Sequence, residues 1–165
     1  CRWDEVDSLC CHVKSVNLGM NYIVSITDKH GKSAGFNIVH NVFASKKKKA
    51  AFAEMFEMVM TGLNEKHILP KAEEMYKNIQ SGNEMTIAGA KVSRLGVEIT
   101  KGLIKKENVF IPYSEMELLF PEGTGGFRIA SITNSKDFQH FFFAGLETRY
   151  LLALMEKIVP GERRH

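Results

Sequence analysis

The sequence predicts a mainly β protein with helices, of the α+β class, in which a complete module follows a partial copy of itself. The first observation is a repeated order of three strand-like segments and one helix, in residues 3–63 and again in residues 113–159. The second is that each helix carries a single apolar stripe, which must pack on something. The 165-residue chain is 44% hydrophobic and 25% charged, as globular proteins are.

The two copies align block by block, with gaps only where loops are expected. Glu5 lies over Glu115, Leu9 over Leu119, and the segment Ile-Val-Ser-Ile-Thr at 23–27 over Ile-Ala-Ser-Ile-Thr at 129–133. The helical stripe of Phe52, Met55, Phe56 and Val59 lies over Leu151, Leu154, Met155 and Ile158. We therefore predict two backbones with the same element order. We also expect Phe52, Phe56, Leu151 and Met155 to be nearly buried against their own sheets.

In the first copy, apolar residues alternate with polar ones over residues 3–13, 22–27 and 33–39, which predicts a three-stranded meander. The segment Asp-Lys-His-Gly at 28–31 predicts a tight turn. Ser45 is a good N-cap for a helix over residues 46–63. A polar break is expected at residues 64–69, and Pro70 suits the first position of a second helix reaching Gln80.

The second copy has additional strands in front of the repeated block. Residues 85–87 and 91–93 are interpreted as one strand bent at Gly89, followed by strands at 97–100 and 109–111. A hairpin loop at 122–126 then separates two strands of the repeat, and a helix over about 146–159 ends the module. About seven short antiparallel strands and one helix predict a small sandwich or barrel with a helix at its open end.

The residues that carry a family resemblance lie in this second copy. They are the turn at Gly96-Val97, the segment Phe-Ile-Pro-Tyr-Ser-Glu-Met at 110–116, and the helix Leu-Leu-Ala-Leu-Met-Glu-Lys-Ile at 151–158. They resemble the pleckstrin-homology (PH-like) superfold, and in particular tandem PH-like domains of uncharacterised bacterial proteins. The resemblance implies an antiparallel barrel or sandwich capped by a C-terminal helix. It covers residues 84–159 fully and residues 3–63 as the last three strands and helix of a second copy.

The resulting domain prediction has three parts. Residues 1–63 form a partial module, residues 64–82 a helical linker, and residues 83–165 a complete module. The segment equivalent to 85–112 has no counterpart ahead of Trp3. Because the chain begins with Cys1 rather than Met, we expect it to be a piece of a longer protein. No apolar run reaches the about 20 residues of a membrane span, so no transmembrane segment is expected within it.

Cys10 and His12 are the nearest approach to a metal or nucleophile site, because strand alternation places them on one face. Two ligands do not close a site, and ordinary strand residues are the favoured interpretation. The three cysteines include no CxxC pair, and they favour a reducing, cytoplasmic setting. The glycine-rich segment 123–126 lacks the Lys-Ser/Thr of a phosphate loop and precedes a strand, which favours a hairpin. We predict no enzymatic activity, no cofactor and no metal.

The basic residues are the remaining candidates for binding. A run of four lysines, Lys46, Lys47, Lys48 and Lys49, begins the first helix, where the helix dipole disfavours positive charge. A solvated helix face explains this run, and so does contact with anionic lipid or an acidic partner. Phosphoinositide-binding PH domains carry basic residues in their early loops. The resemblance therefore implies a second candidate set, namely Arg94, Lys101, Lys105 and Lys106.

These observations lead to a functional prediction. The chain is expected to be a non-enzymatic PH-like adaptor or membrane-proximal module, and the alternative is a domain that binds anionic-lipid or phosphoinositide headgroups. The expected partners are a protein or an anionic membrane surface, in the cytoplasm or at the inner face of a membrane. Nucleic acid is not expected, because the aromatic residues follow the predicted core rather than an exposed basic strand.

Overall fold

The computed structural model describes residues 5–16, 19–41, 45–102, 106–121, 125–143 and 145–159. It has three antiparallel sheets and helices, which confirms the predicted α+β class. The chain divides into two compact units. The first comprises Cys1–Pro70 with Ala144–Leu146, and the second Lys71–Phe143 with Glu147–His165.

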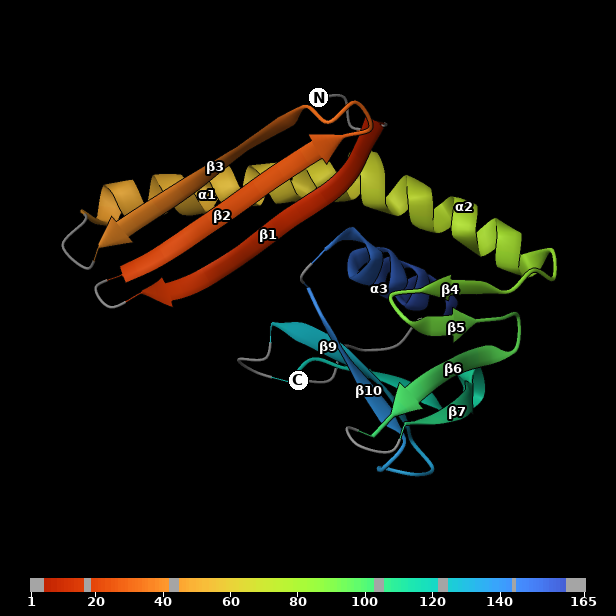
Figure 1. Ribbon diagram of the computed structural model, residues 1–165. Coiled ribbons are helices and arrows are strands. Elements are labelled where there is room, and N and C mark those ends of the chain that lie inside the picture. The colour runs from red at the N-terminus through yellow and green to blue at the C-terminus, as the bar shows by residue number, and fades with distance from the viewer. Residues whose placement is uncertain are drawn as a thin grey trace. The chain divides into compact units, whose positions relative to one another are not determined.

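The first unit is a three-stranded meander with a helix on one face, as the sequence predicts (Figure 1). Its strands are β1 (Val6–Val16), β2 (Gly19–Asp28) and β3 (Ser33–Asn41), and its helix is α1 (Lys46–Leu63). Strands β2 and β3 are longer than expected, because backbone pairing continues beyond the segments with clear apolar alternation. Strand β1 has the predicted length but lies three residues later in the chain.

Local chemistry explains where these elements begin and end. The turn after β2 is held by Asp28, whose buried carboxylate accepts hydrogen bonds of 2.9 Å from the backbone N–H groups of His30 and Lys32. Burial opposes ionisation of Asp28, but these two bonds and the nearby His30 charge lower its pKa. Ser45 is the N-cap of α1, because its hydroxyl accepts a 3.3 Å hydrogen bond from the backbone N–H of Lys48.

The expected polar break at residues 64–69 is wrong. Helical structure continues from α1 through a π-helical turn, Asn64–Ile68, into α2 (Leu69–Gln80). The backbone N–H of Leu69 bonds to the carbonyl of Asn64, five residues earlier, which is the π-helical spacing. Pro70 has no N–H to donate and would crowd the turn before it, and the wider turn relieves this conflict without ending the helix.

The second unit contains α2, seven strands and the C-terminal helix, and the strand number matches the prediction. One sheet has the order β4 (Met85–Ile87), β5 (Ala90–Val92), β6 (Gly96–Lys101) and β7 (Glu107–Pro112). The other has the order β10 (Phe138–Phe142), β9 (Gly126–Ser131) and β8 (Met116–Leu119). Helix α3 (Leu146–Ile158) follows β10. The repeated order of three strands and a helix is therefore present in both units.

The barrel alternative is not borne out, because the described strands form two open sheets and no closed barrel. The β4–β5 hairpin is too short to pair with the end of β6, and β10 lies beside that end. There the backbone N–H of Thr100 donates to the side-chain Oε1 of Gln139 at 2.8 Å. A side chain thus takes the place that a neighbouring strand would occupy in a closed ladder.

The interpretation of residues 85–93 as one strand bent at Gly89 is also wrong. Ala88 and Gly89 are the two central residues of a hairpin turn, with φ angles of 51° and 83°. Two consecutive positive φ values are the signature of a type I′ turn, which matches the natural twist of paired strands. In the sequence only Gly89 signalled a positive φ, because alanine rarely adopts a positive φ and Ala88 therefore gave no sign of a turn.

Core formation differs between the units. Leu151 and Met155 of α3 are completely buried, which confirms the expectation for the second unit. Phe52 and Phe56 of α1 are only partly buried, so the expectation holds less fully for the first unit. In the second unit two sheets and α2 surround the core, whereas in the described part of the first unit α1 faces a single sheet.

Candidate functional site

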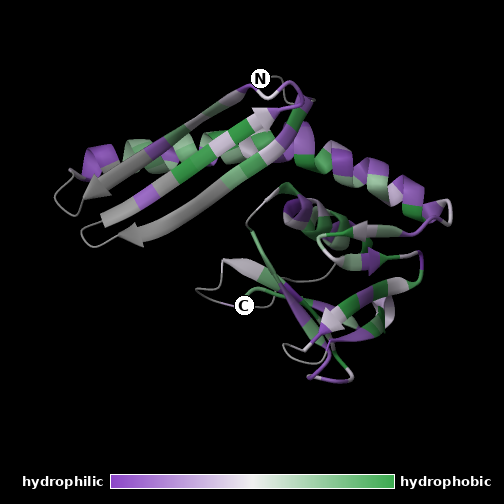
Figure 2. Cartoon of the chain, in the orientation of Figure 1, coloured by the Kyte–Doolittle hydropathy of each residue, from purple (hydrophilic) through white to green (hydrophobic). Residues whose placement is uncertain are grey.

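The lysine run forms an exposed cationic surface at the start of α1. Lys46, Lys47 and Lys48 are all exposed, and the side chain of Lys49 lies outside the described part of the structure. The first turn of α1 contains no acidic residue, and the helix dipole adds further positive potential there. This end of α1 is coloured hydrophilic in Figure 2. The start of the helix is therefore a local excess of positive charge facing solvent.

Lys101, by contrast, is engaged within the fold. Its ammonium group lies 2.5 Å from Oδ1 of Asp137 and 3.6 Å from Oε2 of Glu107. The hydrogen bond to Asp137 raises the pKa of Lys101, burial opposes the rise, and the charges of both carboxylates support it. This lysine joins the end of β6 to the loop before β10, so its charge is largely neutralised by the protein itself.

The second predicted basic set is not brought together. Arg94 lies in the turn before β6, whereas Lys101 ends that strand and Lys106 precedes β7. A strand of this length separates its ends by roughly 17–20 Å. Lys105 lies outside the described residues. Arg94 thus occupies the end of the sheet opposite to Lys101 and Lys106, and one headgroup would not reach both ends.

The structure shows no metal or phosphate site at either segment considered from the sequence, the cysteines and His12 of β1 or the glycine-rich loop, among the described residues. Cys10 is exposed on β1, and Cys11 and His12 pair through their backbones with Val24 and Ile23 of β2. Within the described residues no three His, Cys, Asp or Glu side chains are grouped to hold a metal. The glycine-rich loop connects β8 to β9 of one antiparallel pair, as the hairpin interpretation requires, although residues 122–124 lie outside the described residues.

The acidic residue that recurs in both copies has a structural role in the second unit. The backbone N–H of Ile132 donates to the carbonyl of Glu115 at 2.9 Å, and the hydroxyl of Thr133 donates to its Oε2 at 3.0 Å. These bonds join the start of β8 to the end of β9. They support the view that the repeated carboxylate positions are structural.

One exposed surface was missed by the sequence reasoning. Phe138 and Phe142 of β10 are 39% and 62% exposed on the face opposite to the buried Phe141. The Arg128 guanidinium lies 5.0 Å from the centre of the Phe138 ring, and its Nε lies 3.4 Å from Nδ1 of His140. Burial, and then the Arg128 charge, lower the pKa of His140. The sequence did contain a signal for this surface, because strand alternation over residues 138–142 places Phe138 and Phe142 on the face opposite to Phe141.

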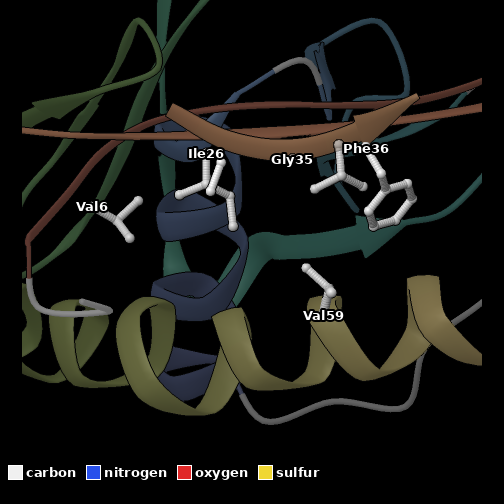
Figure 3. A pocket seen from close by; sticks show the side chains of 7 residues that line it. Val6, Ile26, Gly35, Phe36 and Val59 are labelled. Carbon is white, nitrogen blue, oxygen red and sulfur yellow. The ribbon is translucent and has the colours of Figure 1, made fainter. Parts of the chain in front are cut away.

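A second missed feature is an apolar hollow in the first unit, with a volume of about 300 Å³ between the sheet and α1. Figure 3 shows Val6, Ile26 and Phe36 from the sheet pointing toward Val59 of the helix across this space. The lining residues are Val6, Val24, Ile26, Ala34, Gly35, Phe36 and Val59. None of these side chains can form a hydrogen bond.

Comparisons with protein-family models, with curated proteins and with solved structures find no match to this chain. In the part of the chain that the structure describes, no helix is both long and apolar enough to cross a membrane.

Proposed function

We propose that this chain is a non-enzymatic, PH-like interaction module that works as an adaptor close to an anionic membrane surface. The resemblance stated from the sequence supports the PH-like assignment, and so does the order of seven strands and a helix in the second unit. A location in the cytoplasm, at the inner face of a membrane, is part of the same proposal. There anionic lipids attract exposed lysines.

The observation that carries this proposal is the exposure of Lys46, Lys47 and Lys48 at a helix start whose first turn contains no acidic residue. Each lysine close to an anionic bilayer contributes about 1 kcal/mol, so three contribute about 3 kcal/mol. That corresponds to a dissociation constant of roughly 5–10 mM. Such a surface does not anchor a protein by itself, but it orients one that is held near the membrane by another contact.

The alternative, stereospecific binding of a phosphoinositide headgroup, has less support. It would need several basic side chains around one phosphate cluster, and Lys101 is already paired with Asp137. Arg94 lies at the other end of β6. The first interpretation therefore fits the geometry better than the second.

Vesicle sedimentation at low and high salt distinguishes the two functions. We expect equal, weak binding to phosphatidylserine and phosphoinositide vesicles of matched total charge, and loss of binding to both as salt rises. A preference for the phosphoinositide that persists at high salt would instead establish the headgroup-binding alternative, because direct bonds to phosphate are screened less. No binding at low salt would reject both functions.

A further inference from the structure

We propose that the first unit binds an extended segment of a partner protein as an additional strand on the free edge of β3, with apolar side chains of that segment in the hollow beside α1. The inference rests on the proposed adaptor function and names the way in which the adaptor holds a protein. Among the described residues β3 pairs only with β2, so one edge of its nine residues is open. An open edge presents unpaired N–H and C=O groups, which another strand can pair with.

The direction of these backbone groups follows from the turn before β3. There the backbone N–H of Asp28 donates to the carbonyl of Lys32 at 2.9 Å, so these two residues form a hydrogen-bonded pair of the ladder. Such pairs alternate along antiparallel strands, and the register of β3 with β2 is continuous. The N–H and C=O groups of Ser33, Gly35 and Asn37 therefore point away from β2. All three residues are exposed, so the edge offers a regular row of donors and acceptors.

Nothing in the sequence of β3 protects this edge. Soluble proteins commonly guard an open edge with a lysine, a proline or a bulge. The segment Ser33–Asn41 contains no lysine, arginine, aspartate, glutamate or proline, and its pairing with β2 has no bulge. The edge is therefore suited to accept another strand.

The hollow beside this edge selects the side chains of the added strand. Ala34 and Phe36 alternate with the outward-pointing residues, so their side chains lie on the face that α1 covers, and both line the hollow. Figure 3 shows Phe36 on one side of this space and Val59 of α1 on the other. Ala34 is exposed, so the hollow of about 300 Å³ is open at the edge itself. Side chains opposite Ala34 and Phe36 enter it, and the apolar lining requires them to be apolar.

The charge of the segment follows from the other end of β3. Only residues 42–45 separate β3 from α1, so the end of the strand lies close to the exposed lysines at 46–48 (Figure 1). Along α1 these lysines lie about 16–20 Å from Val59, a distance that five or six residues of an extended strand span. The first turn of α1 contains no acid, and the exposed Glu54 and Glu57 follow more than a full turn later. An acidic stretch five or six residues from the apolar ones is therefore complementary.

A second copy of this chain fits the edge less well. If two β3 strands paired antiparallel, the lysines of one copy would lie beside the turn at residues 28–32 of the other. The charges at and beside that turn nearly cancel, namely those of Asp28, Glu5 and Asp7 against those of Lys29 and Lys32. The turn therefore brings no net negative charge to the lysines, whereas an acidic segment does. A segment antiparallel to β3 carries its acidic residues before its alternating apolar residues.

The test is a fluorescence-anisotropy titration of the whole chain with a labelled nine-residue probe peptide. The probe begins with three acidic residues, and threonine and valine then alternate, so that the valines face the hollow. We expect saturable binding of one peptide per chain. A probe with lysines in place of the acidic residues should bind about tenfold more weakly or worse, because like charges then meet at the start of α1.

Two methylated probes distinguish strand addition from a general apolar contact. N-methyl groups on the threonines block the N–H groups that face β3, because residues with side chains on the outer face form the hydrogen-bonded pairs here. This probe should lose saturable binding. N-methyl groups on the valines point away from β3, and we expect that probe to keep an affinity within about threefold of the original.

Asn37→Pro tests the edge from the side of the protein. It removes an outward N–H and no bond to β2, so the sheet keeps its ladder and the affinity for the probe should fall by about tenfold or more. Asn37→Thr keeps the N–H and should bind as the native chain does. Val59→Trp fills the hollow and should also weaken binding by about tenfold. Met58→Trp is its matched control, since Met58 is 68% exposed on the same helix.

Absence of saturable binding, equal affinity for the two methylated probes, or native affinity of Asn37→Pro would overturn the proposal. Self-association of the native chain that Asn37→Pro abolishes would overturn it as well, because a second copy would then occupy the edge. Binding to anionic vesicles without binding to the probe would refute this inference and leave the proposed membrane contact standing.

Discussion

The ammonium group of Lys101, at the end of β6, forms a 2.5 Å ion pair with Asp137 in the loop before β10. This contact connects the two sheets of the second unit, next to the bond between Thr100 and Gln139. We expect Lys101→Gln and Asp137→Asn each to lower the unfolding midpoint. The double variant should lose less than the sum of both, because the residues act as a pair.

The pH dependence of this contact has a definite sign. Hydrogen bonding to Asp137 raises the pKa of Lys101 above its unfolded value. The stabilisation is therefore complete below about pH 10 and is lost as the pH rises through the raised pKa. Denaturant unfolding of the native chain and of Lys101→Gln at neutral and alkaline pH measures this, with Lys136→Gln as an exposed control. If the losses in free energy of unfolding caused by Lys101→Gln and Asp137→Asn add up fully in the double variant, the predicted coupling of the two residues is wrong.

The turn at Ala88 and Gly89 offers a gain in stability. Alanine at a positive φ carries a steric cost of about 1 kcal/mol, and Asn-Gly is the preferred pair for this turn type. We expect Ala88→Asn to increase the free energy of unfolding by about 0.5–1 kcal/mol. Ala88→Val should lower it, because a β-branched residue tolerates positive φ least. Destabilisation by Ala88→Asn in denaturant melts would show that the turn is of another type.

Most elements of the fold were predictable from sequence, because alternation and helical stripes report which face of each element is buried. The type I′ hairpin was not, because Ala88 hides the second positive φ. The continuous helix was missed because Pro70 usually starts a helix, and a π-helical turn has no sequence signature of its own. The hollow was missed because apolar alternation predicts burial, but it does not tell how well the buried volume is filled.

The candidate site was predictable only in part. The lysine run is local in sequence and is exposed as a surface should be. The grouping of Arg94 with Lys101 failed because nearness in sequence says nothing about which end of a strand each residue occupies. The ion pair between Lys101 and Asp137 joins residues that are far apart in the chain, so no local sequence pattern predicts it.

The difference in core packing between the units predicts unequal costs of truncation. Leu154→Ala removes a completely buried side chain and should cost about 2–5 kcal/mol. Phe56→Ala removes a partly exposed one, and we expect only about 1–2 kcal/mol. Native-state hydrogen exchange reports each unit separately, so the two losses are measured in one experiment. A larger loss for Phe56 would show that α1 is covered more completely than one sheet allows.

The phenol of Tyr113, just before β8, is partly buried and hydrogen-bonded. Its hydroxyl donates to the carbonyl of Ser93 at 2.6 Å, and burial raises its pKa to about 12. Because burial raises this pKa above its unfolded value, the neutral phenol favours the fold fully below about pH 10, and this contribution is lost as the pH rises toward 12. Tyr113→Phe should cost about 1 kcal/mol at neutral pH. In a spectrophotometric titration it should also abolish the phenol ionisation near pH 12, and persistence of that ionisation would refute the assignment.

The most direct test of the proposed function is vesicle sedimentation with two charge-matched variants. One replaces Lys46, Lys47 and Lys48 with Gln, and the other replaces three exposed lysines elsewhere, Lys66, Lys77 and Lys136. Both variants lose the same net charge, so a general attraction to anionic lipid would weaken equally in both. The account predicts that only the first variant loses binding to phosphatidylserine vesicles at low salt. Equal loss in the two variants, or binding by the first that matches the native chain, would contradict it.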